Sequence, residues 1–358
     1  MRKALKIVTV ILLLIPSLAF SCSTFSFTDN GKILFGRSYD WNIGYGYLIK
    51  NNRNIRKTTY LPYVEKRAVW TSKYGSITFN QYGREYPIGG MNEKGLVVEV
   101  MVLRSSKYPP KDMRPAVSEL GYVQYQLDTS ASIEDVIDSD KKVRLSNRSF
   151  AGIHYLISDS TGKTIAVEFL NGKRVVHSGS GLPYKCLTNN TYQESLKYLK
   201  NFEGFSGDKK IDDRYHLSAH SLNRFAIIAD IIKHRKKTVS VSNSFEILDK
   251  VKDDRRSQFQ IVYDIKEMRI HFRSLKAKSI KQVDLAKFDF ACNFPVKMFN
   301  INTPRKGDIS NRFKLYNSKL NRDLVIKAYV DSAIKLPVEE LLKIAAFPET
   351  LKCRTSKN

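Results

Sequence analysis

Strand-like and helix-like segments occur in blocks along this chain, and this order limits the fold more than any other feature. Alternating or apolar runs predict a first block of strands at residues 24–27, 33–35, 47–49, 56–60, 76–79 and 96–103. Parallel sheets need strands and helices in regular alternation, and this chain lacks it. We therefore expect an α+β fold in which helices cover antiparallel sheets.

The later blocks complete the pattern. Helical periods predict helices at residues 116–127, 132–137, 192–199, 222–232 and 245–251. Further strands are expected at residues 154–158, 164–168, 174–177, 258–265 and 268–272. The turn sequences "TDNG", "STGK" and "LNGK" each predict a hairpin between neighbouring strands.

The length and composition favour one domain. The chain has 358 residues, of which 42% are hydrophobic and 11% aromatic, so it can bury a large core. No Pro/Gly-rich linker divides it, and we predict one domain over residues 22–358. The tail after about residue 300 is basic and less patterned, and either wraps the core or is partly mobile.

The first 21 residues are typical of a signal peptide. Three basic residues precede a short apolar run at 8–14, which is too short to span a bilayer. Ala19-Phe20-Ser21 fits the small-x-small cleavage rule, so we expect cleavage to leave Cys22 first. The sequence thus predicts an exported protein, periplasmic or secreted, with no integral membrane span.

The net charge is strongly positive. It is +25 for the whole chain, and it falls to +22 when the three signal-peptide cations are removed. Basic clusters lie at 234–237, 250–256 and 276–281, without stacking aromatics or a nucleic-acid-binding motif. We expect no nucleic-acid partner, while a weak attraction to anionic cell-surface polymers or lipid remains open.

The chain has four cysteines: Cys22, Cys186, Cys292 and Cys353. An even set in an exported protein suggests pairing, but the sequence leaves the pairing open. Cys186 is interpreted first as a small core residue and second as a disulfide partner. No Cys/His spacing suggests zinc, and the six histidines show no metal-ligand or triad spacing. We expect no metal and no organic cofactor.

A cysteine at the new N-terminus has three possible roles: a lipid anchor, half of a disulfide, or a nucleophile. A lipobox needs Leu or a similar residue three positions before the cysteine and small residues between, and here Ala19, Phe20 and Ser21 stand there. As a nucleophile, Cys22 would carry its own base, because a free α-amine ordinarily has a pKa of about 8. We favour the nucleophile.

Two charged residues support this interpretation. Arg37 and Asp40 in "FGRSYDWN" lie at the end of the second predicted strand, and a hairpin would return them close to Cys22. Arg37 could lower the pKa of the thiol. Asp40 could accept a hydrogen bond from the α-amine. On spacing alone, a surface ion pair is an equal alternative.

Six blocks in order resemble one enzyme family. They are "CSTFSF…GRSYDW", "GGMNEKGLVVEVMVL", "HYLISDSTGKTIAVEF", "LTNNTY", "SLNRF" and "FQIVYDIKEMRIHFRS", which together cover most of residues 22–290. This set is similar to the choloylglycine hydrolase and penicillin V acylase family, which are N-terminal-nucleophile amidases. The resemblance implies a four-layer αββα sandwich with two antiparallel sheets between helix layers.

The resemblance also implies roles for single residues. Cys22 would be nucleophile and, through its amine, base, with Arg37 and Asp40 beside it. Asn189 matches the family's oxyanion-hole asparagine, and Arg224 matches the arginine that organises the nucleophile. The backbone N–H of Val102 would complete the oxyanion hole.

Val102 is a departure from the family, because bile salt hydrolases carry an asparagine at this position and penicillin V acylases a tyrosine. Glu168 and Tyr82 either line a pocket or are structural. Asn92 in "GGMNEKG" is interpreted as a turn residue.

The predicted function is an exported amidase that hydrolyses a linear, non-peptide C–N bond through a Cys22 thioester. Its partner would be a small-molecule N-acyl amide, and the family resemblance implies a possible homo-tetramer. One alternative is an acyltransferase that uses the same acyl-enzyme. The other is a lipid-anchored surface binding protein without catalysis.

Overall fold

The computed structural model describes residues 22–61, 65–149, 151–212, 220–234, 239–254 and 256–354. The predicted signal peptide lies outside these residues. Within them, no helix is long and apolar enough to cross a membrane.

The first of two large sheets carries the N-terminal hairpin. Its seven strands lie in the order β14-β1-β2-β15-β16-β17-β19. They span Cys186–Leu187 (β14), Ser23–Asp29 (β1), Lys32–Asp40 (β2), Ser257–Asp264 (β15), Arg269–Ser274 (β16), Lys281–Asp284 (β17) and Gly307–Asp308 (β19). The turn between β1 and β2 contains Asn30 and Gly31, both at positive φ, and so confirms the "TDNG" hairpin.

The second sheet has nine strands in the order β13-β12-β11-β8-β7-β6-β3-β18-β20. They span Lys173–Ser178 (β13), Thr164–Leu170 (β12), Ile153–Ser158 (β11), Val97–Val102 (β8), Pro87–Asn92 (β7), Ser76–Asn80 (β6), Tyr47–Asn51 (β3), Lys297–Asn300 (β18) and Lys314–Leu315 (β20). β11, β12 and β13 are joined by the two predicted hairpins and pair antiparallel.

The two sheets pack face to face. Phe79 of β6 makes edge contacts with Tyr263 of β15 and Phe272 of β16, so aromatic rings of one sheet meet those of the other. The central strands β2, β8, β11 and β15 are buried along most of their length. Such burial on both faces accounts for the apolar runs read in the sequence, because the outer faces are covered too.

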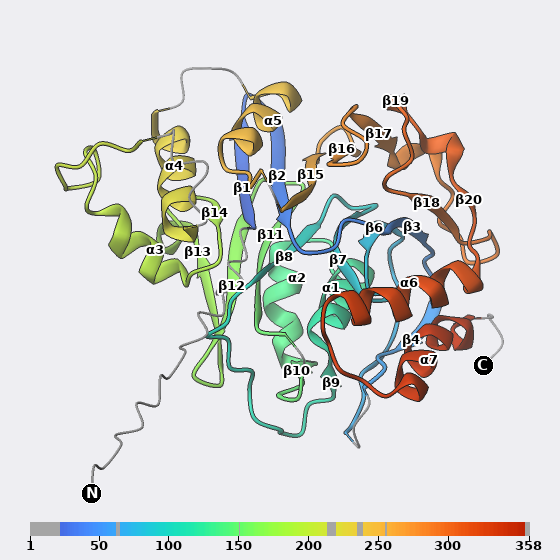
Figure 1. Cartoon of the computed structure of the whole chain (residues 1–358). Helices are drawn as coiled ribbons and strands as arrows, with labels where there is room; N and C mark the ends of the chain where they lie inside the picture. Colours follow the sequence, from blue (N-terminus) through green and yellow to red (C-terminus); the bar gives the residue numbers. More distant parts are fainter. Residues whose placement is uncertain are drawn as a thin grey trace, which may run out of the picture.

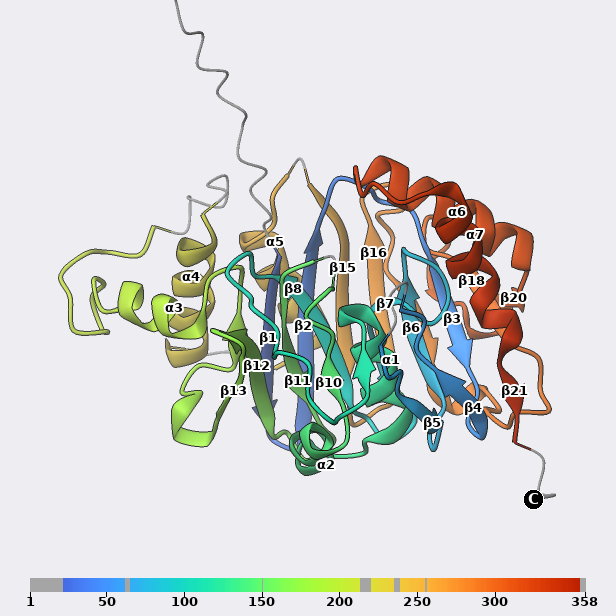
Figure 2. The same ribbon diagram turned by 90° about the horizontal axis from the view of Figure 1, so that it is seen from below.

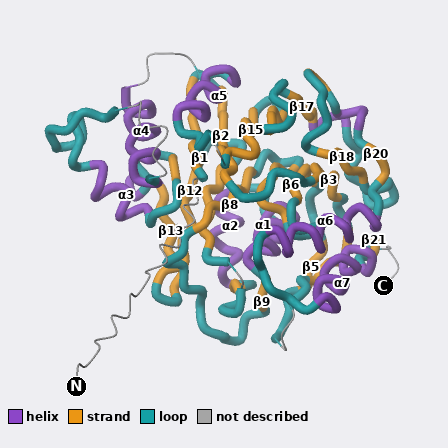
Figure 3. The backbone as a smooth tube through the Cα atoms, viewed as in Figure 1, coloured by secondary structure: helices purple, strands orange, loops and turns teal. Residues whose placement is uncertain are grey.

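Helices cover both outer faces (Figure 1). On the seven-stranded sheet, α4 (Ser221–His234) contacts β1, and α5 (Val241–Lys250) contacts β2 and β15, while α3 (Tyr192–Leu199) packs on α4. On the nine-stranded sheet, α1 (Glu119–Thr129) contacts β7 and β8, with α2 (Ile133–Asp138) following it. In the same view, Figure 3 shows α3 and α4 at one side of the molecule and α6 and α7 at the other. The predicted αββα order is confirmed.

Some local predictions were wrong. The helix expected at 116–127 begins at Glu119, because Ser118 caps it by accepting from the Gly121 N–H, and Ala116–Val117 forms a short strand, β9. β9 pairs parallel with β10 (Arg144–Leu145), and β17 pairs parallel with β19, so the sheets are not purely antiparallel.

The strands expected at 47–49 and 56–60 lie in different sheets. β3 belongs to the nine-stranded sheet, while β4 (Ile55–Thr58) lies between β5 (Val69–Thr71) and β21 (Lys352–Cys353) in a small sheet.

The C-terminal tail wraps the core. It forms α6 (Ser318–Asp331) and α7 (Val338–Ala346), which pack on each other and add Val325, Ile344 and Phe347 to the main cluster of buried apolar residues. A disulfide between Cys292 and Cys353 joins the end of the tail to the loop before β18, with Cα atoms 5.5 Å apart. Figure 2 shows α6 and α7 side by side at the edge near β3, β18 and β20.

Candidate active site

Cys22 lies immediately before β1, and it is 2% exposed. β1 pairs with β2 in the register Ser23↔Ser38, which brings the end of β2 beside the cysteine. The Cys22 thiol sulfur lies 3.8 Å from Nη2 of Arg37 and 3.8 Å from the carbonyl oxygen of Asp40. The hairpin thus returns Arg37 and Asp40 to Cys22. Burial raises the pKa of the Cys22 thiol, and the Arg37 charge works against this rise.

Arg37 is held by the opposite sheet. Its guanidinium forms an ion pair with Glu99 of β8, and Nη1 donates to the Ile88 carbonyl at 3.0 Å. The Tyr263 hydroxyl donates to the same Glu99 carboxylate. Burial disfavours the Arg37 charge, but the Glu99 carboxylate outweighs it and raises the pKa of Arg37. The sequence reasoning missed Glu99, although a carboxylate inside the apolar run "LVVEVMVL" is a signal for a buried partner.

Asp40 has one satisfied and one open oxygen. Oδ1 accepts from the hydroxyls of Ser38 and Ser257, at 2.7 and 2.5 Å. Oδ2 is buried and has no hydrogen-bond partner among the described residues. Burial raises the pKa of Asp40 to about 6, and the Arg224 charge opposes the rise. The open oxygen can therefore accept a further hydrogen bond.

Arg224 joins α4 to the start of β1. Its Nε donates to the Ser23 hydroxyl at 3.0 Å, and Nη2 donates to the Cys22 carbonyl at 3.4 Å and to Oδ1 of Asn189 at 2.9 Å. Arg224 is 1% exposed, so its charged group, and not only its stem, is buried. Burial lowers its pKa, while Asp40 and Cys22 favour its charge. One guanidinium therefore fixes both Cys22 and Asn189.

Asn189 lies between β14 and α3 and reaches the end of β8. Its Nδ2 donates to the Val102 carbonyl at 2.9 Å, which uses one of its two amide hydrogens. The Leu103 N–H donates to the Gly152 carbonyl, so Val102 turns its own N–H and C=O to the other edge of β8. The pairing of β7 with β8 stops at Glu99. The Asn189 amide and the Val102 N–H thus lie at one edge.

A buried network fixes the segment before Asn189. His154 lies 2.7 Å from the Thr188 carbonyl through Nε2 and 3.1 Å from Glu168 through Nδ1. His177 contacts the other Glu168 oxygen at 2.9 Å. Burial works to raise the pKa of Glu168, but the bonds with His154 and His177 outweigh it and lower the pKa to about 2. Glu168 is thus structural, and the sequence reasoning missed both histidines because their partners are distant in sequence.

The remaining candidates have structural contacts. Cys22 and Cys186 are both buried and unpaired, which excludes a disulfide at Cys22 in this structure. Cys186 lies in the core, and burial raises the pKa of its thiol. Asn92 ties its turn to the end of α1 by donating to the Leu127 and Ser130 carbonyls. Tyr82 packs edge-on against Tyr329 of α6.

No metal centre is found in the described parts of the chain. No group of three or more His, Cys, Asp or Glu side chains there could hold a metal ion. The chemistry that the cluster offers is that of a buried thiol beside a guanidinium, an open carboxylate oxygen and two N–H donors. These groups suit nucleophilic attack on a carbonyl.

Known proteins resemble this chain in sequence and in fold. Among curated proteins, a penicillin V acylase from Pectobacterium atrosepticum is 25% identical over 261 residues, which cover 62% of this chain and 69% of the relative. The structure of penicillin V acylase from Agrobacterium tumefaciens matches with a TM-score of 0.67 and 23% identity, covering 83% of this chain and 98% of that one.

A second solved structure has the same fold. A mutant of conjugated bile acid hydrolase from Clostridium perfringens matches with a TM-score of 0.64 and 20% identity, covering 80% of this chain and 98% of that one. The family model of the linear amide C–N hydrolases, choloylglycine hydrolase family, matches residues 22–298. The chain therefore belongs to the choloylglycine hydrolase family, and it is a hydrolase of non-peptide C–N bonds.

Proposed function

We propose that this protein is an exported amidase that cleaves a linear N-acyl amide through a thioester on Cys22. The observation that carries the proposal is the contact between the Cys22 sulfur and the Arg37 guanidinium at 3.8 Å, beside the unpartnered Oδ2 of Asp40. Burial alone would keep the thiol neutral, whereas the nucleophile is the thiolate. A cation beside the sulfur favours the thiolate, and Arg37 supplies that cation.

Acylation needs a base at Cys22. Once residue 22 is the first residue, its α-amine can take the thiol proton, and Asp40 Oδ2 can accept a hydrogen bond from the resulting ammonium. The thiolate attacks the substrate carbonyl carbon and forms a tetrahedral intermediate. The ammonium then gives its proton to the leaving nitrogen, the C–N bond breaks, and an acyl thioester and a free amine remain.

Deacylation repeats these steps with water. The α-amine takes a proton from water, and the hydroxide attacks the thioester carbonyl. The C–S bond breaks, the acid leaves, and the proton returns to the sulfur. In both half-reactions, the second Asn189 N–H and the Val102 N–H would donate to the oxyanion. Arg224 keeps Asn189 in place through its bond to Oδ1.

The substrate class follows from the relatives. The relatives are named for two kinds of acyl amide, penicillin V and conjugated bile acids. Both kinds contain an amide and a hydrophobic acyl group. At residue 102 this chain offers a small apolar side chain, so only the backbone N–H would serve the oxyanion there. We therefore expect an N-acyl amide with an apolar acyl group.

Export is supported by one observation besides the signal-peptide pattern. The disulfide between Cys292 and Cys353 is of the kind that persists in oxidising compartments such as the periplasm or the outside of the cell.

The test is hydrolysis of a panel of N-acyl amides by three purified mature proteins: wild type, Cys22→Ala and Cys22→Ser. The panel holds phenoxyacetyl, bile-acyl and straight-chain acyl amides. We expect hydrolysis of at least one substrate by wild type and loss of most of it in both variants, with unchanged far-UV spectra. Full hydrolysis by Cys22→Ala would refute the assignment of the nucleophile.

A further inference from the structure

The loop between β6 and β7 spans residues 81–86 and lies against β2, the strand that carries Arg37. We call it the 81–86 loop. At its start, Gln81 accepts from the Tyr39 hydroxyl, and two residues after its end the Ile88 carbonyl accepts from Nη1 of Arg37 at 3.0 Å. Arg37 and Tyr39 lie on the same face of β2, because side chains alternate along a strand. The loop thus holds the face of β2 that carries Arg37.

The backbone of this loop is strained. Gly83 has φ of +99°, and a Cβ added there would lie 2.5 Å from Cγ2 of Val325 on α6. Glu85 has φ of 73°, in the left-handed region that few non-glycine residues adopt. Such a conformation persists only where its surroundings hold it. The loop therefore depends on the elements that pack around it.

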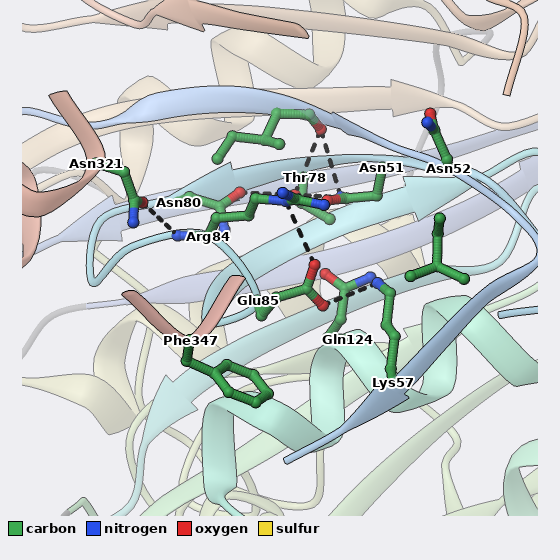
Figure 4. A network of polar contacts seen from close by, with 12 residues as sticks. Asn51, Asn52, Lys57, Thr78, Asn80, Arg84, Glu85, Gln124, Asn321 and Phe347 are labelled. Carbon is green, nitrogen blue, oxygen red and sulfur yellow. Dashed lines mark hydrogen bonds and ion pairs between the residues drawn. The ribbon is translucent and has the colours of Figure 1, made fainter. Parts of the chain in front are cut away.

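One side of the loop is held by buried ions. The Lys57 ammonium of β4 lies 2.8 Å from the Glu85 carboxylate and 3.1 Å from the Asp128 carboxylate of α1. Gln124 and Trp70 donate to Asp128, each at 2.8 Å. Figure 4 shows Lys57, Glu85 and Gln124 close together. This side belongs to the part of the chain that matches the family.

The other side of the loop is held by the C-terminal helices. Oδ1 of Asn321 on α6 accepts from the Arg84 N–H at 2.8 Å, as Figure 4 shows, and its Nδ2 donates to the Ala345 carbonyl of α7 at 3.1 Å. Asn321 is 1% exposed. At the end of α6, the hydroxyls of Ser332 and Tyr82 lie 2.9 Å apart. The family match ends at residue 298, so these contacts come from outside it.

We propose that the C-terminal helices α6 and α7 are part of the catalytic apparatus, and that Asn321 is a positioning residue that holds Arg37 at Cys22 through the 81–86 loop. This inference rests on the proposed function. Its physical basis is that a strained loop with one support removed relaxes, and Gln81 and Ile88 then move away from Tyr39 and Arg37.

The test compares four mature proteins: wild type, Asn321→Leu, Ser332→Ala and Asp323→Ala. Leu at 321 keeps the volume and removes both hydrogen bonds, while Ser332→Ala removes one contact at the end of the same helix. Asp323→Ala is the matched control, because it changes that helix at an exposed residue whose ion pair is with Lys319. The measurements are the rate of iodoacetamide alkylation of Cys22 against pH, kcat and KM, and the melting temperature.

For Asn321→Leu we expect the alkylation profile to move to higher pH and kcat to fall about tenfold, since small misplacements at a reacting centre are costly. Ser332→Ala should shift the alkylation profile and kcat in the same directions, but by less. If Asn321→Leu does not fold, the result for Ser332→Ala alone tests the inference. Lower melting temperatures with an unchanged alkylation profile and kcat would overturn the inference. Alkylation needs no substrate, so an unreactive wild-type Cys22 would instead refute the proposed function.

Discussion

Arg37 and Glu99 form an ion pair across the two sheets, and both side chains are 1% exposed. Glu99 belongs to β8 of the nine-stranded sheet, and Arg37 to β2 of the seven-stranded sheet. Because Arg37 also contacts the Cys22 sulfur, this pair ties the proposed nucleophile to the interior of the sandwich.

Glu99→Gln tests this pair. The variant leaves a buried guanidinium without its counter-charge, and breaking such a pair costs about 3–5 kcal/mol. We expect a loss of this order in the free energy of unfolding, measured with urea. Glu134→Gln, which breaks the exposed pair with Lys163, is the control and should leave the free energy of unfolding unchanged. A Glu99→Gln protein as stable as wild type would show that the ion pair does not stabilise the fold.

The ionisation of Asp40 is expected to set the acid limb of the profile of kcat/KM against pH. Its pKa is raised to about 6 by burial, so the carboxylate is ionised above this pH and protonated below it. A free Cys22 ammonium would favour the ionised form and lower this pKa. We expect kcat/KM to fall as the pH drops through 6 or somewhat below it. In Asp40→Asn the activity should be low and this limb lost; an unchanged limb would assign it to another group.

Protonation of Glu168 is expected to lower the free energy of unfolding in acid. Its pKa is lowered from 4.5 to about 2, so its contribution is fully present above pH 4.5 and is lost as the pH falls toward 2. The size is about 3 kcal/mol, from about 1.4 kcal/mol for each pKa unit. Urea unfolding at several pH values measures it. Glu168→Gln should be less stable at pH 7 and should lose less stability over this range than wild type.

The disulfide is expected to raise the melting temperature under oxidising conditions only. Cys292 and Cys353 are 61 residues apart, and closing a loop of that length stabilises a fold by about 4 kcal/mol when only chain entropy is counted. The double variant Cys292→Ser/Cys353→Ser should melt at a lower temperature than wild type under oxidising conditions. Under reducing conditions the two proteins should melt alike, and a persistent difference would mean that the substitutions act by another route.

The sequence predicted much of the fold because most of its signals are local. Alternation and the "TDNG", "STGK" and "LNGK" turns located the hairpins, and one hairpin was enough to place Arg37 near Cys22. The resemblance added Asn189 and Arg224, which are distant in the chain. The structure brings all of them together.

What the sequence did not predict depends on contacts between distant segments. Glu99 is a single carboxylate in an apolar strand, and its partner is 62 positions away. The sequence spacing of His154 and His177 gives no sign that they share a partner. They meet only because Glu168 lies on the strand between theirs and contacts both. α6 was missed because polar and basic residues interrupt its apolar period, and because it buries residues such as Asn321 that read as surface positions. α7 does keep a helical apolar period at Leu341, Ile344 and Ala345, which the sequence reasoning did not follow into the tail.

The role of Cys22 as an N-terminal nucleophile is tested most directly by the intact mass of the exported protein, measured before and after a short pulse of iodoacetamide. We expect a chain that begins at an unmodified Cys22 and gains one carbamidomethyl group, located at Cys22 by peptide mapping. A chain with a lipid on Cys22, or one that begins at another residue, would remove the α-amine base and contradict the proposed mechanism.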